Sequence, residues 1–112
     1  MGKLLTEEVI DSAFQWLLAS SEEIAMARGN VIRTEFKAKK THARLYLQAT
    51  GTIESKKAQA TDSPEYEVAM EAYATAMEVW ERAQDQRNRA ELIIEAYRTE
   101  QASERALGRA TR

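Results

Sequence analysis

Helix-breaking residues are rare in this chain of 112 residues, and their positions constrain its fold more than any other feature. The chain has one proline and four glycines, and its internal breaks fall at Gly29, Gly51 and Pro64. Beyond Pro64 neither residue type recurs until Gly108. Proline and glycine are the residues that most strongly end regular structure. Their spacing therefore predicts an all-α fold of long helices.

We expect three helices in a single helical domain over residues 1–112. They are an acidic helix at about residues 6–28, a basic helix at about 30–50 and a long helix at 64–107, with a connector at 51–63 that can form a turn or two of helix. Arg28, Gly29 and Asn30 are expected to form a C-cap or a kink between the first two helices.

Capping residues mark two of the predicted helix starts. Thr6 is a suitable N-cap, because its hydroxyl can accept a hydrogen bond from the first turn. At the long helix, Asp62 or Ser63 can serve as the N-cap and Pro64 suits the first turn. Glu65 could then complete a capping box.

The predicted long helix is too long for a compact globule. Its 44 residues would extend about 65 Å, whereas a globule of this chain length has a radius of gyration near 13 Å. We therefore expect an elongated helical hairpin or bundle, or an assembly of several copies. A polar run at residues 84–89 is either exposed or a break between two helices. Because the run lacks glycine and proline, an unbroken helix is favoured.

Large apolar and aromatic residues follow a coiled-coil spacing on the long helix. The predicted interface for oligomers or partners consists of Tyr66, Met70, Tyr73, Met77 and Trp80, continued by Ile94 and Tyr97. The chain has 19 alanines but only 20 residues of Leu, Ile, Val and Phe together, which is few for a core. A small domain with a poor core often completes it with copies of itself. We therefore expect a homo-oligomer.

The residue inventory argues against an enzyme. The chain has no cysteine and only one histidine, His42, which removes thiol chemistry and multi-histidine metal sites. No serine-nucleophile motif or glycine-rich phosphate loop occurs. We expect no catalytic residues, cofactor or metal. No apolar run reaches the length of a membrane span, and no secretory signal is evident, so a soluble, cytoplasmic protein with no membrane partner is expected.

Charge is distributed very unevenly along the chain. Residues 28–57 carry eight Lys and Arg and two Asp and Glu, whereas residues 1–27 carry one and five. On a helical wheel, four of the cations fall within about 60° of one another. This cationic row consists of Arg33, Lys37, Lys40 and Arg44.

A cationic row on a helix suits a phosphate backbone, because Lys and Arg displace condensed counterions whatever the base sequence. Lys56 and Lys57 could extend the row if the connector folds back. The alternative is a solvated helix face that pairs with carboxylates of a neighbouring helix. His42 lies about 160° from Arg44 on the wheel and does not belong to the row.

One segment of the chain resembles a phage protein family. His42-Ala43-Arg44-Leu45-Tyr46 is followed by Gly51, an aromatic residue near a helix start and a long helix that contains Trp80. This layout resembles the UvsY family of phage recombination mediators, in which a Lys-Ala-Arg-Leu stretch before a Tyr and a Gly is linked to binding of single-stranded DNA. His42 stands where the family has lysine.

The resemblance implies a small helical protein that assembles into rings and helps to load a RecA-type recombinase onto DNA coated by single-strand-binding protein. It would act in the host cytoplasm if phage-encoded. From another class of function, the alternative is an adaptor or inhibitor without nucleic-acid binding, whose row of Met and Tyr residues binds a partner helix.

Overall fold

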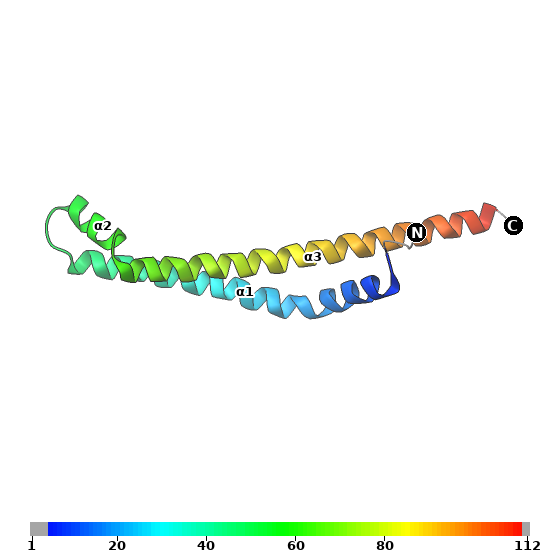
Figure 1. Ribbon diagram of the computed structural model, residues 1–112, viewed down its shortest axis with the longest axis horizontal. Coiled ribbons are helices and arrows are strands. Elements are labelled where there is room, and N and C mark those ends of the chain that lie inside the picture. The colour runs from blue at the N-terminus through cyan, green and yellow to red at the C-terminus, as the bar shows by residue number, and fades with distance from the viewer. Residues whose placement is uncertain (1–4, 111–112) are drawn as a thin grey trace. The chain divides into compact units, whose positions relative to one another are not determined.

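The computed structural model describes residues 5–110, which form three α-helices and no strand (Figure 1). The helices are α1 (Glu7–Gln48), α2 (Ile53–Thr61) and α3 (Pro64–Ala110). The predicted all-α class and the long C-terminal helix are confirmed. With 47 residues, α3 is about 70 Å long. It runs without interruption through residues 84–89, as the absence of glycine and proline indicated.

The predicted boundary between the first two helices is wrong, because α1 continues through Gly29 and Asn30. Gly29 lacks the positive φ that a glycine C-cap requires. Ala27 and Val31 are buried on either side of it. Burial of this face outweighs the cost of about 1 kcal/mol that glycine adds inside a helix. By contrast Gly51, at φ +112°, lies just beyond the end of α1.

The predicted connector at residues 51–63 contains a helix, α2, longer than the turn or two expected. Thr52 caps its start by accepting a hydrogen bond from the backbone N–H of Ser55 at 3.2 Å. Asp62 is its C-cap. Ser63 is therefore left as the N-cap of α3, and its hydroxyl accepts a hydrogen bond from the N–H of Glu65 at 3.3 Å. Thr6 caps α1 as predicted, accepting from the N–H of Val9 at 3.2 Å.

The buried face of each long helix repeats every seven residues. On α3 the alanines at positions 69, 76, 83 and 90 are buried, and the larger residues Tyr66, Tyr73 and Trp80 lie partly buried between them. On α1 the buried and half-buried positions advance alternately by four and three residues from Ile10 to Leu45. A repeat of 3.5 residues per turn is that of coiled-coil packing. The repeat passes Gly29 without a change of phase.

We call this packed face of α1 and α3 the seam. On α3 the methionines of the predicted coiled-coil row do not occupy its most buried positions. Met70 is 39% exposed, whereas its neighbour Ala69 is 7% exposed. Met77 is half-buried, and Ala76 beside it is buried. Small side chains let two helices approach closely, so alanine occupies the position that the apolar pattern assigned to methionine. The tyrosines and Trp80 keep their predicted place on the seam.

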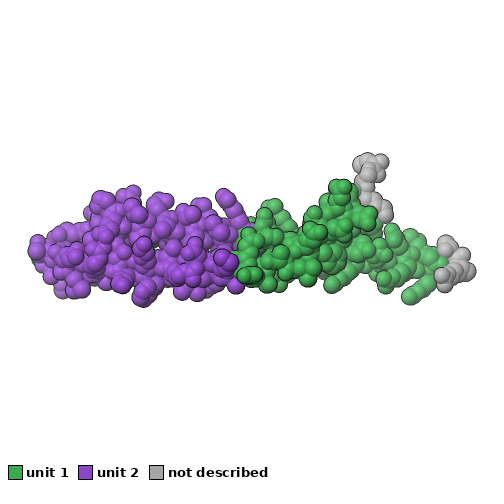
Figure 2. Space-filling model, turned by 90° about the horizontal axis from the view of Figure 1, so that it is seen from below, with its two compact units in different colours: residues 1–23, 83–112 green, residues 24–82 purple. Residues whose placement is uncertain are grey.

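The described residues form two compact units (Figure 2). Unit 1 draws on residues 5–23 and 83–110, and its core consists of Ala13, Ala90 and Ile94. Unit 2 is residues 24–82 and contains the second half of α1, α2 and the first part of α3. In unit 2, α1 and α3 run antiparallel, because Arg28 lies over Trp80 while Arg44 pairs with Glu65.

Candidate nucleic-acid interface

The cationic row lies on the second half of α1, in unit 2. Its members advance along the helix by four, three and four residues, the same repeat as the seam. They lie beside the seam rather than on it, because the seam positions of this segment are Val31, Thr34, Ala38 and Thr41. All four cations are exposed. The structure therefore presents Arg33, Lys37, Lys40 and Arg44 on one solvent-facing side of α1.

One member of the row has a carboxylate partner. Nη2 of Arg44 donates to Oε1 of Glu65 on α3, and both side chains are about half exposed. Among the described residues, no ion pair involves Arg33, Lys37 or Lys40. Lys39, which lies off the row, pairs with Glu35 one turn back at 3.0 Å. Three of the four cations are thus left for an external anion.

Gly29 makes room for the first residue of the row. The guanidinium of Arg33 folds back along α1, and its Nη1 lies 3.2 Å from the position that a Cβ atom of residue 29 would occupy. Gly29, which the sequence predicts as a helix end, therefore lies within α1 and leaves space for the side chain of Arg33.

The connector folds back against α1, but it does not extend the row. Figure 1 shows α2 beside the C-terminal end of α1, where the side-chain amide of Gln59 donates to the carbonyl of Thr50 at 2.8 Å. Nζ of Lys56 lies 5.8 Å from the centre of the Tyr46 ring. Tyr46 is about 160° around α1 from Arg44. Lys56 is therefore on another side of the helix.

Lys57 lines a groove of about 490 Å³ with residues of α1 and α2, namely His42, Ala43, Tyr46, Leu47 and Thr61. It is exposed. Like Lys56, Lys57 therefore lies beside Tyr46 and not in the cationic row.

His42 joins the three helices of unit 2. Its Nε2 lies 3.2 Å from Oγ1 of Thr61 on α2. Its ring meets the ring of Tyr66 on α3 edge to face, with 4.9 Å between the centroids. This position agrees with the wheel, which separates His42 from the cationic row. The residue that departs from the UvsY pattern thus packs between helices.

The residues predicted as an oligomer or partner interface lie mainly within the chain's own helix pair. Tyr66, Tyr73, Trp80 and Tyr97 are half-buried and Ile94 is buried. Ile94 packs in the core of unit 1, and Trp80 carries the guanidinium of Arg28 4.8 Å above its ring. Met70 is the member that the fold leaves most exposed.

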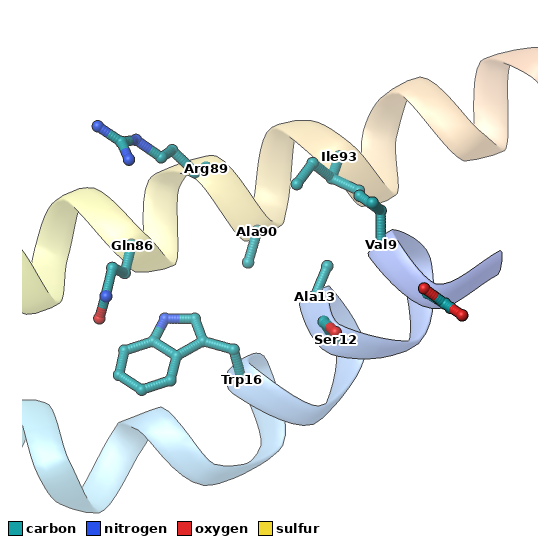
Figure 3. Close-up of a pocket in the computed structure, with 9 residues that line it drawn as sticks. Val9, Ser12, Ala13, Trp16, Gln86, Arg89, Ala90 and Ile93 are labelled. Atoms are coloured by element: carbon teal, nitrogen blue, oxygen red, sulfur yellow. The ribbon is translucent and has the colours of Figure 1, made fainter. Parts of the chain in front are cut away.

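A groove in unit 1 was not foreseen from the sequence (Figure 3). It measures about 570 Å³ and is lined mainly by Val9, Ala13, Trp16, Ala90 and Ile93. Figure 3 shows the indole of Trp16 extending from α1 toward α3, and its N–H is buried without a hydrogen-bond partner among the described residues. The groove forms where two alanines face each other across the pair. Because the two alanines lie on different helices, the sequence pattern of either helix does not predict that they face each other.

Within residues 5–110, no helix is long and apolar enough to cross a membrane, and no three His, Asp or Glu side chains lie together as a metal site would require. Comparisons of the chain with protein-family models, curated proteins and solved structures found no match.

Proposed function

We propose that the protein binds single-stranded nucleic acid electrostatically through the cationic row of α1. The observation that carries this proposal is a straight row of four exposed cations, three of them without an ion pair in the described structure. From Arg33 to Arg44 the row covers twelve residues, or about 16 Å of helix. Phosphates lie about 3.4 Å apart along one strand of a stacked helix. One protomer can therefore contact about four phosphates.

The proposal extends to recombination on the strength of the UvsY resemblance. Arg44, Ala43 and Leu45 match the family's motif, and the other cations of the row supply charge where His42 replaces its lysine. In this role the protein would help a RecA-type recombinase to replace single-strand-binding protein on DNA. An assay of recombinase loading onto coated single strands tests the extension separately from binding itself.

The adaptor alternative has less support. It relies on the Met and Tyr row of α3, and the tyrosines of that row are half-buried against α1 within the same chain. A partner helix would have to displace α1 to reach them.

Replacing Lys37 and Lys40 by alanine should weaken binding equally for all base sequences. Each cation that neutralises a phosphate contributes about 0.7 to the slope of log affinity against log salt for a single strand. We expect a slope of about −3 for the natural protein and about −1.5 for the double variant. Fluorescence anisotropy of a labelled oligonucleotide over a series of salt concentrations measures both.

Lys39→Ala is the matched control, because Lys39 is adjacent in sequence, points away from the row and already pairs with Glu35. It should leave the salt slope unchanged. A natural protein whose affinity does not vary with salt, or that binds no oligonucleotide at low salt, would contradict the proposal.

A further inference from the structure

Beyond the seam, α1 carries a second apolar row that faces away from α3. Within unit 2 it consists of Ile32, Phe36 and Ala43, all exposed, with Phe36 at 68%. The first part of α3 also carries an exposed apolar row, made of Val68, Ala72 and Val79, with Val68 at 70%. In both rows the second and third residues follow the first by four and eleven positions. Two exposed apolar rows of the same spacing therefore lie on different helices of one unit. Val68 and Ala72 line one side of a groove whose other side is Lys37 and Thr41 of α1, and Ala43 lines the groove beside α2.

Opposite charges accompany the two rows. On α1 a cation directly follows each apolar residue, at Arg33, Lys37 and Arg44. On α3 a carboxylate directly precedes each one, at Glu67, Glu71 and Glu78. All six are exposed, and Arg44 is the one that has an ion pair among the described residues. The surfaces are thus complementary in charge as well as matched in apolar spacing.

The order of charge and apolar residue decides which orientation fits. Successive residues lie about 100° apart around a helix, always in the same rotational sense. The cations of α1 and the carboxylates of α3 therefore flank their apolar rows on opposite rotational sides. When two helices lie parallel and face to face, opposite rotational sides meet, as they do in parallel coiled coils. An antiparallel pair would separate the charges.

The chain cannot make this parallel contact with itself. In unit 2 its own α1 and α3 run antiparallel and meet through the seam. We propose that α1 of one copy packs in parallel on α3 of a second copy, with Ile32, Phe36 and Ala43 against Val68, Ala72 and Val79 and the cations against the carboxylates. Because two different surfaces meet, each copy added leaves one of each surface free, so assembly continues beyond the dimer.

The contact is a single helix pair about 16 Å long. Its area is at the low end for specific interfaces, so association is weak and depends on protein concentration. It also uses cations of the proposed nucleic-acid interface. If the proposed function holds, an oligonucleotide competes with the second copy for these side chains and dissociates the assembly; the contact itself does not depend on that function.

Charge reversal on one surface at a time tests the proposal. The α1 variant carries Arg33→Glu and Lys37→Glu, and the α3 variant carries Glu67→Lys and Glu71→Lys. Sedimentation velocity without nucleic acid measures the size of the assembly. For the natural protein this size should increase with protein concentration, and the assembly should dissociate as the salt concentration rises. In either variant alone like charges meet, and self-association should weaken by about tenfold or more.

A mixture of the two variants should associate again, because the reversed α1 of one then meets the reversed α3 of the other. Failure of the mixture to associate overturns the proposal, as does a natural chain that stays monomeric or variants that associate as it does. Phe36→Ala should weaken association without any change of charge, and Arg98→Glu in unit 1 should have no effect. Circular dichroism confirms that each variant keeps its helices.

The α3 variant separates this proposal from the proposed function. Its cationic row is intact, so it should lose self-association and still bind an oligonucleotide. If this variant lost oligonucleotide binding as well as self-association, Glu67 and Glu71 would not act only in the contact between copies, and the assignment would be overturned.

Discussion

Gly29 and Gly51 have different backbone conformations, so substituting alanine at each should change stability in opposite directions. Gly29 is helical, and the atoms nearest to a Cβ there belong to the guanidinium end of the Arg33 side chain, which can shift to make room. Gly29→Ala should therefore raise the free energy of unfolding by about 0.5–1 kcal/mol, the gain in helix propensity. Gly51 has φ +112°, so Gly51→Ala should lower it by about 1 kcal/mol. Urea unfolding followed by circular dichroism measures both, and effects of the same sign would contradict these backbone assignments.

At the scale of the helix pair, the seam depends on alanine rather than on the larger apolar residues. Ala76 is 3% exposed, whereas Met70 is 39% exposed. Ala76→Leu should overpack the seam and lower the free energy of unfolding by about 1–3 kcal/mol. Met70→Ala should lower it by less, about 1 kcal/mol or below, because the side chain lies beside the seam and is already 39% exposed.

The same urea midpoints compare these two variants. If Met70→Ala lowered the free energy of unfolding more than Ala76→Leu does, the methionines and not the alanines would face α1. The experiment thus distinguishes the seam of the structure from the seam that the apolar pattern predicts.

At the scale of the whole molecule, the charge of the candidate interface depends on a contact between helices. Glu65 of α3 neutralises Arg44 of α1, and both side chains are about half exposed. Because exposed ion pairs contribute less than about 1 kcal/mol, Glu65→Gln should leave stability nearly unchanged. It should raise oligonucleotide affinity about threefold, since one negative charge is removed and Arg44 is released. Anisotropy at low salt measures the change; an unchanged affinity would place Arg44 outside the interface.

Much of this architecture was predictable from short-range signals. The end of α1 near Gly51, the start of α3 at Ser63 and Pro64 and the unbroken helix beyond them all follow from the backbone preferences of a few residues. The cationic row was also predictable, because its side chains project from one helix at a fixed 100° per residue. Each of these features depends only on residues within or next to one helix, so a second helix is not required to predict it.

The tertiary structure decided what depends on another helix. Gly29 ends α1 or lies inside it according to whether Ala27 and Val31 find a surface to bury against. Ala69 and not Met70 occupies the seam because the approach of α1 favours the smaller side chain. Arg44 acquires Glu65, and His42 acquires Tyr66, only when residues about twenty positions apart are brought together. The sequence determined that these segments are helical and where their charges lie, since these are local properties. Burial, pairing and the continuation of α1 through Gly29 depend on contacts between helices, and the fold decided them.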